Sequence, residues 1–263
     1  MDSELTCESG PRHTPRQCRD CAQRPSASSA NRHHGRRFDQ RYAHSCRPGI
    51  GRKIPRKTDA QSIGLVGAGR IGALTLWALS QWFPNVTVFR AYDQNNARLD
   101  AFVSHMARQG IGIEACPGFR EALSDADIGV VATTESEPYV TEAEFKRGSL
   151  FMNVSLMDPT FELVSAADKI VVDDWHQSVH SDRVLARMHR EGLVTREGIH
   201  GEFGEVVAGR IPGREHPDER IFWNPFGLAI EDIAVASAIY EEALLKGLGQ
   251  PLQLVDQEWD VLF

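Results

Sequence analysis

The sequence predicts an α/β fold built on a doubly wound parallel sheet, and three observations support this. An apolar run at residues 62–66 breaks into three glycines at G-x-G-x-x-G spacing. From Gln61 onward, apolar strand patterns alternate with amphipathic helix patterns, as parallel strands joined by crossover helices do. An acidic residue closes the second strand. Together these features indicate a Rossmann-type domain.

The glycine segment is expected to form a strand, a tight turn and the start of a helix over residues 73–79. Gly67 allows the sharp turn, Gly69 removes the side chain that would block a pyrophosphate, and Gly72 lets the helix lie close to its strand. Phosphates would then meet the free N–H groups and the positive dipole end of the helix. The segment therefore predicts a dinucleotide site, although the same turn could also bind nothing.

The second strand, residues 85–93, ends at Asp93. This residue lies 21 positions beyond Gly72, where the dinucleotide fingerprint places a carboxylate on the adenosine ribose. A carboxylate would repel a 2′-phosphate, so the sequence predicts NAD in preference to NADP.

The remaining elements follow in alternation. The expected strands are 111–115, 127–134, 148–154, 169–173 and 220–223, and the expected helices are 95–109, 119–124, 162–167, 179–191 and 227–246. Ligands of such sheets bind outside the carboxyl ends of the strands. Thr133, at the end of one strand, is therefore expected near the cofactor.

The first 60 residues have a different composition. Residues 1–61 hold 13 Arg and Lys against 6 Asp and Glu, with almost no apolar periodicity, so a disordered basic leader is expected. A zinc site at Cys18 and Cys21, with the later histidines and Cys46, is a weaker alternative, because the second ligand pair lacks regular spacing. Nonspecific nucleic-acid binding and a mis-started or frame-shifted coding region are further alternatives.

Several classes of protein are disfavoured. No run of 18 apolar residues exists and the N-terminus lacks the apolar segment of a secretory signal, so we expect a cytoplasmic protein with no membrane partner. Cys116 is the only cysteine beyond the leader and is expected to be reduced. The acids and histidines between Asp173 and His180 have ligand chemistry but no ligand spacing, so a solvated strand end is favoured and no metal site is predicted.

Two later segments suggest a family. GEFGEVVAGR at residues 201–210 and NPFGLAIED at residues 224–232, together with the glycine segment and the strand ending at Thr133, resemble the ornithine cyclodeaminase and mu-crystallin family over about residues 61–250. The resemblance implies an NAD-binding Rossmann domain at residues 61–223. It also implies a C-terminal segment at 224–263, whose helix normally joins a second lobe.

The resemblance is strongest to one kind of family member. NVSLMDP at residues 153–159, VDDW at 172–175 and IPGR at 211–214 are similar to dehydrogenases of siderophore-type biosynthesis. This implies an NAD-dependent oxidoreductase that cleaves N-(2-amino-2-carboxyethyl)-L-glutamate into 2,3-diaminopropionate and 2-oxoglutarate. The alternatives are an ornithine cyclodeaminase, which makes proline and ammonia, and a truncated, non-catalytic NAD-binding protein.

The resemblance also assigns roles to residues. It places Arg70 and Ile71 on the pyrophosphate, and Thr133 and Ser155 on the nicotinamide side. Asn153 and Asn224 are implied cofactor contacts as well. Asp158 falls where cyclodeaminases carry a catalytic aspartate, although an aspartate before proline could equally cap the next helix. The segment MDPTFEL at residues 157–163 is one residue shorter than the cyclodeaminase pattern, which favours a dehydrogenase.

One departure from the family concerns length. Family members resemble one another in having more than a hundred residues before the glycine loop, in a lobe that binds substrate and forms homodimers. This chain has about 60 residues there. The resemblance thus implies a final helix with an exposed apolar stripe, and a chain that binds NAD but catalyses poorly unless the lobe is supplied.

Overall fold

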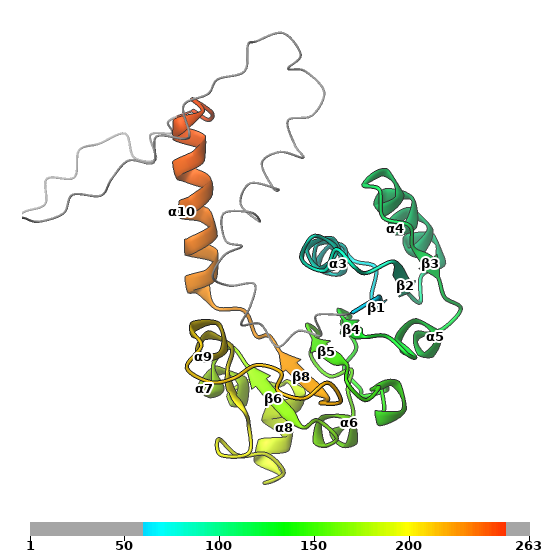
Figure 1. Ribbon diagram of the computed structural model, residues 1–263, viewed down its shortest axis with the longest axis vertical. Helices are drawn as coiled ribbons and strands as arrows, with labels where there is room; N and C mark the ends of the chain where they lie inside the picture. The colour runs from blue at the N-terminus through cyan, green and yellow to red at the C-terminus, as the bar shows by residue number, and fades with distance from the viewer. Residues whose placement is uncertain (1–59, 251–263) are drawn as a thin grey trace, which may run out of the picture. The chain divides into compact units, whose positions relative to one another are not determined.

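The computed structural model describes residues 60–250 (Figure 1). Within them, eight parallel strands form one sheet in the order β3-β2-β1-β4-β5-β8-β6-β7. This confirms the predicted doubly wound α/β fold. The predicted disorder of the leader and the alternative zinc site lie in residues 1–59, outside the described residues.

Most strands are short and buried. Their bounds are β1 Ser62–Val66, β2 Val88–Tyr92, β3 Glu114–Ala115, β4 Ile128–Val131, β5 Leu150–Asn153, β6 Lys169–Val172, β7 Gly201–Glu202 and β8 Ile221–Asn224. β8 is the last of the described strands along the chain, yet it pairs with both β5 and β6. The predicted domain boundary after Trp223 falls inside this strand, one residue before its end.

The helices connect successive strands. They are α3 Arg70–Trp82, α4 Asn96–Arg108, α5 Phe119–Leu123, α6 Phe161–Ser165, α7 Trp175–Val179, α8 Val184–Arg190, α9 Phe203–Ala208 and α10 Ala229–Leu245, with a 3₁₀ turn, η2, at Glu142–Glu144. α3 packs on β1 and beside α4, whereas α5 packs on β1 and β2 (Figure 1). No helix among the described residues is long and apolar enough to cross a membrane.

Side chains from alternate strand positions enter two separate apolar clusters. Along β5, Leu150 and Met152 join the cluster that includes α3 and α4, and Phe151 joins the cluster with α5, α6 and α8. β8 divides in the same way between Ile221 and Phe222. Because both faces of a parallel sheet are covered, its strands are apolar on both sides rather than alternating with polar residues.

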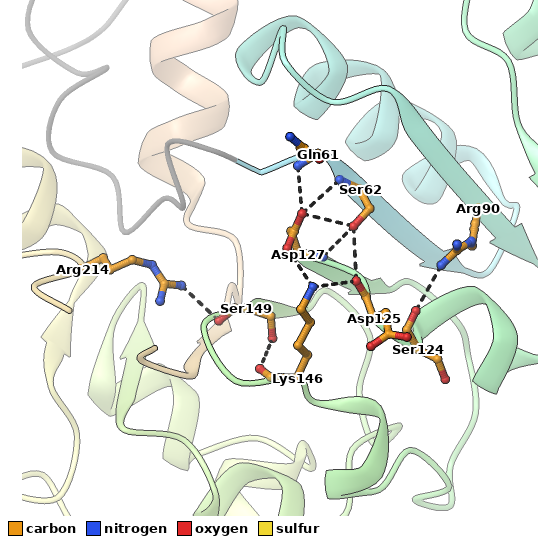
Figure 2. Close-up of polar contacts among 9 residues, drawn as sticks. All are labelled: Gln61, Ser62, Arg90, Ser124, Asp125, Asp127, Lys146, Ser149 and Arg214. Atoms are coloured by element: carbon orange, nitrogen blue, oxygen red, sulfur yellow. Dashed lines mark hydrogen bonds and ion pairs between the residues drawn. The ribbon is translucent and has the colours of Figure 1, made fainter. Parts of the chain in front are cut away.

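The amino ends of β1, β4 and β5 are joined by a polar cluster around Asp127 (Figure 2). Its Oδ2 accepts hydrogen bonds from the backbone N–H groups of Gln61 and Ser62, at 2.8 and 3.3 Å. Its Oδ1 accepts one from Lys146 Nζ at 3.1 Å, and the same ammonium donates to the Asp125 carbonyl. This cluster joins the amino ends of the strands, at the end of the sheet opposite the glycine loop.

Some predicted elements were wrong in extent. The predicted helix at 179–191 is two helices, because the chain breaks at residues 180–183, where the Ser181 hydroxyl accepts the Arg183 N–H and the Val184 N–H donates to the Leu156 carbonyl. The predicted strand at 111–115 pairs only at Glu114–Ala115. β7 and α9 were not predicted as elements.

The final helix, α10, exposes its apolar side chains. None of its residues is buried, and Ile230, Ile233 and Leu244 are between 60% and 70% exposed. The expected exposed apolar stripe is therefore present in the described chain.

Candidate functional site

The glycine loop packs tightly against the ends of β2 and β4. Gly67 has a φ of +99°, which favours glycine, and its N–H donates to the Tyr92 carbonyl at 2.9 Å. A Cβ at Gly67 would collide with the Ala132 carbonyl and would lie 3.2 Å from Cγ2 of Thr133. The turn at Gly67 therefore lies close to Thr133.

The second and third glycines differ in their surroundings. No heavy atom lies within 4 Å of the position that a Cβ at Gly69 would occupy, whereas a Cβ at Gly72 would collide with the Gly67 carbonyl. Gly69 is also the N-cap of α3, whose first turn has no acidic residue. Arg70 and Ile71 follow it and are exposed. An open cradle therefore lies at the start of α3, beside free backbone N–H groups.

Asp93 is buried next to this loop. Its Oδ2 accepts the Ala68 N–H and its Oδ1 accepts the Asn95 N–H, both at 2.9 Å. Arg98 lies 3.6 Å from Oδ2. The carboxylate thus connects the glycine loop to the start of α4, a role that the sequence did not reveal.

Besides the glycine loop and Asp93, the candidate site includes a cluster of polar side chains around Asp158. Asp158 follows β5 and is fully buried. Its Oδ1 accepts hydrogen bonds from the hydroxyls of Thr133, at 2.6 Å, and Tyr139, at 2.8 Å. Its Oδ2 is buried and has no hydrogen-bond partner in the described chain. A buried carboxylate oxygen without a partner is costly, so this atom is ready to accept a donor from a ligand.

The segment that carries Tyr139 is fixed to the segment that carries Asp158. The Asp158 carbonyl accepts the N–H groups of Tyr139 and Val140, each at 2.9 Å. The Tyr139 ring makes an edge contact with Phe119, with centroids 4.9 Å apart. Burial and the neighbouring Asp158 charge raise the pKa of Tyr139, so its hydroxyl remains a donor at neutral pH.

A chain of polar side chains crosses the ends of β5 and β8. The Ser155 hydroxyl donates to Asn153 Oδ1 at 3.2 Å, and Asn153 Nδ2 donates to Asn224 Oδ1 at 2.8 Å. Asn224 Nδ2 is buried without a partner in the described chain. The site therefore offers one free acceptor, on Asp158, and one free donor, on Asn224.

Asp173 does not lie at a solvated strand end, which corrects the interpretation favoured from the sequence. It is buried, and its Oδ2 accepts the N–H groups of Phe226 and Gly227 at 2.8 and 2.9 Å. Arg183 donates to the Pro225 carbonyl at 2.8 Å and lies over the Phe226 ring. Burial lowers the pKa of Arg183. These two side chains hold the turn between β8 and α10.

The other candidate metal ligands have structural contacts too. Asp174 caps α7 by accepting the Gln177 N–H, and a ring nitrogen of His180 contacts the His176 carbonyl. No group of three or more ligand-type side chains that could hold a metal occurs in residues 60–250. Cys116 is a free, buried thiol whose pKa is raised by burial.

Residues 42–247 match the model of the ornithine cyclodeaminase/mu-crystallin family. The chain belongs to this family.

Its relatives within the ornithine cyclodeaminase/mu-crystallin family include dehydrogenases and reductases. The N-((2S)-2-amino-2-carboxyethyl)-L-glutamate dehydrogenase of Staphylococcus aureus is 34% identical over 200 residues, which are 75% of this chain and 60% of that protein. The alanine dehydrogenase of Archaeoglobus fulgidus is 32% identical over 211 residues, covering 78% of this chain and 64% of the relative.

A solved structure shows the same fold. The Δ(1)-pyrroline-2-carboxylate reductase of Thermococcus litoralis, in complex with NADH and L-proline, superposes with a TM-score of 0.71 at 32% identity. The match covers 78% of this chain and 64% of the reductase. The chain thus spans less than two thirds of the length of these family members.

Some of the predicted site residues lie close together in the structure. Gly67 lies beside Thr133, which donates a hydrogen bond to Asp158, and hydrogen bonds join Asn153 to both Ser155 and Asn224. Tyr139 was not predicted from the sequence, because its hydroxyl reaches Asp158 only in the folded chain. The local signals of an ordered turn there were the proline at position 138 and the capping box that Thr141 forms with Glu144.

Proposed function

We propose that this chain binds NAD at the carboxyl ends of β1, β4, β5 and β8 and forms the nucleotide-binding part of an amino-acid dehydrogenase. The observation that carries the proposal is the continuity of the site. Gly67 lies beside Thr133, and Thr133 donates a hydrogen bond to Asp158 at 2.6 Å. The dinucleotide loop and the acid therefore lie together at the carboxyl ends of the strands.

The glycine loop fits a dinucleotide. The open position at Gly69 and the N–H groups of Arg70 and Ile71 would receive the pyrophosphate, while Gly67 and Gly72 keep the turn tight. Asp93 would contact the adenosine ribose. Thr133, Ser155, Asn153 and Asn224 would surround the nicotinamide, with the free Nδ2 of Asn224 available to a carboxamide oxygen.

Bound NAD would supply the hydride acceptor for oxidation of a carbon that bears an amine. Asp158 would then accept the proton from the substrate amine or from water at Oδ2, the oxygen without a partner. Thr133 and Tyr139 occupy Oδ1, so they determine which oxygen faces the substrate.

For the substrate we favour N-(2-amino-2-carboxyethyl)-L-glutamate, cleaved to 2,3-diaminopropionate and 2-oxoglutarate in siderophore-type biosynthesis. The Staphylococcus aureus dehydrogenase, at 34% identity, supports this choice. The archaeal alanine dehydrogenase with bound NAD is a dimer, which supports a homodimer for this protein as well. We place the reaction in the cytoplasm.

A second candidate function is NAD binding without turnover. It is favoured by one observation, the span of the chain, which covers 60% of the Staphylococcus dehydrogenase and 64% of the alanine dehydrogenase. An ornithine cyclodeaminase is the third possibility and differs from both in its products.

The test is calorimetric titration of NAD into the chain, with Gly69→Val as the blocking variant. A side chain at Gly69 enters open space, so the fold should tolerate it while the pyrophosphate cannot approach. Gly112→Val is the matched control, because Gly112 also has open space around its Cβ position but lies away from the loop. Loss of binding in the first variant alone is expected. Equal binding in both would contradict the proposed site.

Turnover is then measured in the same sample as NADH absorbance after addition of N-(2-amino-2-carboxyethyl)-L-glutamate. Appearance of NADH with 2-oxoglutarate supports the dehydrogenase. Binding without NADH supports the non-catalytic function, and formation of proline and ammonia from ornithine would identify a cyclodeaminase.

A further inference from the structure

Glu144 is a buried carboxylate in a short turn, η2, whose other carboxylate is exposed. The side chain of Glu144 is 4% exposed, whereas that of Glu142 is 53% exposed. Burying an ionised carboxylate is costly unless hydrogen bonds and opposite charges compensate it. The partners of Glu144 in the described chain therefore indicate what this burial maintains.

One oxygen of Glu144 holds the chain just after Tyr139. Its Oε2 accepts hydrogen bonds from the backbone N–H and the hydroxyl of Thr141, both at 2.8 Å. Thr141 is two residues beyond Tyr139, and the intervening Val140 is fully buried and forms a parallel bridge with Pro159. The carboxylate therefore fixes the backbone on the C-terminal side of Tyr139.

The other oxygen of Glu144 is linked to the ring that packs on Tyr139. Its Oε1 accepts a hydrogen bond from Arg120 Nε at 3.3 Å. Arg120 lies in α5, and its guanidinium is 5.2 Å from the centroid of the neighbouring Phe119 ring. Phe119 makes the edge contact with the Tyr139 ring, at 4.9 Å between centroids. Glu144 thus joins two elements, η2 and α5, that meet Tyr139 from different sides.

We propose that Glu144 is a positioning residue for the candidate site. By joining η2 to α5, it keeps the Tyr139 hydroxyl on Oδ1 of Asp158 and so leaves Oδ2 to the substrate. The inference rests on the proposed function, in which Asp158 accepts the proton. Reacting groups must be held within about 0.5 Å of their working geometry by the residues around them. A carboxylate that only capped its own turn would need no contact with α5.

The test follows the Tyr139 hydroxyl itself and needs neither NAD nor turnover. Ionisation of tyrosine is measured by ultraviolet absorbance as pH rises, and Tyr139→Phe identifies the contribution of this residue. Burial and the charge of Asp158 raise the pKa of Tyr139, and Glu135 adds to this effect. In wild type, Tyr139 should therefore titrate above the range of an ordinary tyrosine.

Glu144→Ala removes the acceptor of Thr141 and the partner of Arg120 at once. Tyr139 should then leave Asp158 and gain solvent. The midpoint of its titration should fall by about one pH unit or more, toward the ordinary value of about 10.

Glu142→Ala is the matched control. It removes a carboxylate of the same turn that is also paired with an arginine, Arg220, at 2.7 Å, but that has no contact with α5 among those found in the described chain. The titration of Tyr139 should be unchanged in this variant. An equal shift in Glu142→Ala and Glu144→Ala would overturn the proposal.

Glu144→Gln is the conservative variant. It keeps the shape and one acceptor oxygen for Thr141 but loses the charge that pairs with Arg120, so it should shift the Tyr139 titration in the same direction by a smaller amount. An unchanged titration in Glu144→Ala overturns the proposal. If Glu144→Ala does not fold, as judged by circular dichroism, an unchanged titration in Glu144→Gln overturns it.

Kinetics provide a second readout. Glu144→Ala should lower kcat by about tenfold with little change in KM, and adding Tyr139→Phe should cause no further loss, because both changes act on the same hydroxyl. Absence of NADH formation by the wild-type chain would instead contradict the proposed function, whereas the absorbance titration decides the role of Glu144.

Discussion

Two buried aspartates at opposite ends of the parallel strands are held in different ways. Asp127, before β4, has both oxygens occupied: two backbone N–H groups and the Ser62 hydroxyl on Oδ2, and the Lys146 ammonium on Oδ1. Asp158, after β5, has two hydroxyl donors on Oδ1 and none on Oδ2 in the described chain. A fully satisfied carboxylate stabilises the fold, whereas a half-satisfied one is available to a ligand.

The largest expected effect is on turnover. Asp158→Asn should lower kcat for oxidation of N-(2-amino-2-carboxyethyl)-L-glutamate by about 100-fold or more, because an amide cannot accept the proton. NAD binding should persist, since the glycine loop is unchanged. Product formation followed by NADH absorbance, with calorimetry for NAD, checks both. Turnover within about threefold of wild type would rule out Asp158 as the base.

Asp127→Ala tests the opposite end of the sheet. It should destabilise the chain by about 3 kcal/mol, because it leaves the N–H groups of Gln61 and Ser62 and the Lys146 ammonium without their acceptor. Denaturant unfolding measures the change. Asp182→Ala, at a fully exposed side chain, is the matched control and should leave the unfolding midpoint unchanged. Similar unfolding midpoints for the two variants would contradict the stabilising role of Asp127.

Tyr139→Phe tests the hydroxyls that hold Asp158. Loss of one donor to Oδ1 should lower kcat by about tenfold with little change in KM, since the ring contact with Phe119 is retained. In combination with Asp158→Asn it should cause no further loss, because both changes disable the same group. Additive losses would show that Tyr139 acts independently of Asp158.

The smallest expected effect concerns alkaline stability. Burial and the Asp158 charge raise the pKa of Tyr139 in the folded chain, so the folded state keeps a proton that the unfolded state releases above about pH 10. This stabilisation is fully present below that pH and is lost as pH rises, by at most about 1.4 kcal/mol per pH unit. Denaturant unfolding of wild type and Tyr139→Phe between about pH 8 and 11, where tyrosine titrates, measures how the free energy of unfolding changes with pH. The decrease with rising pH should be shallower in the variant.

Much of the nucleotide-binding loop could be predicted, because the residues that form it are close together in the sequence. Gly67 requires a positive φ within a turn, and Gly72 must let α3 approach its own strand, so both leave a local pattern. Asp93 was found by its spacing from that turn. Its anchoring of Ala68 and Asn95 was not found, because a side chain that accepts backbone N–H groups leaves no motif.

The part of the candidate site around Asp158 and Asn224 depended on contacts between distant segments. Tyr139 meets Asp158 across 19 positions, and Asp173 holds the N–H of Gly227 across 54. The insertion of β8 between β5 and β6 also brings Asn224 to Asn153, 71 residues earlier. None of these pairings has a periodicity or spacing that the sequence could show.

The sequence by itself determined the parallel α/β class and the position of the dinucleotide turn, because apolar periodicity and glycine geometry act over a few residues. The tertiary structure alone decided the strand order around β8, the pairing of Tyr139 with Asp158, and which buried carboxylate is satisfied. Those features arise from burial and hydrogen bonding between segments far apart in the chain, which form only when the whole sheet has been assembled.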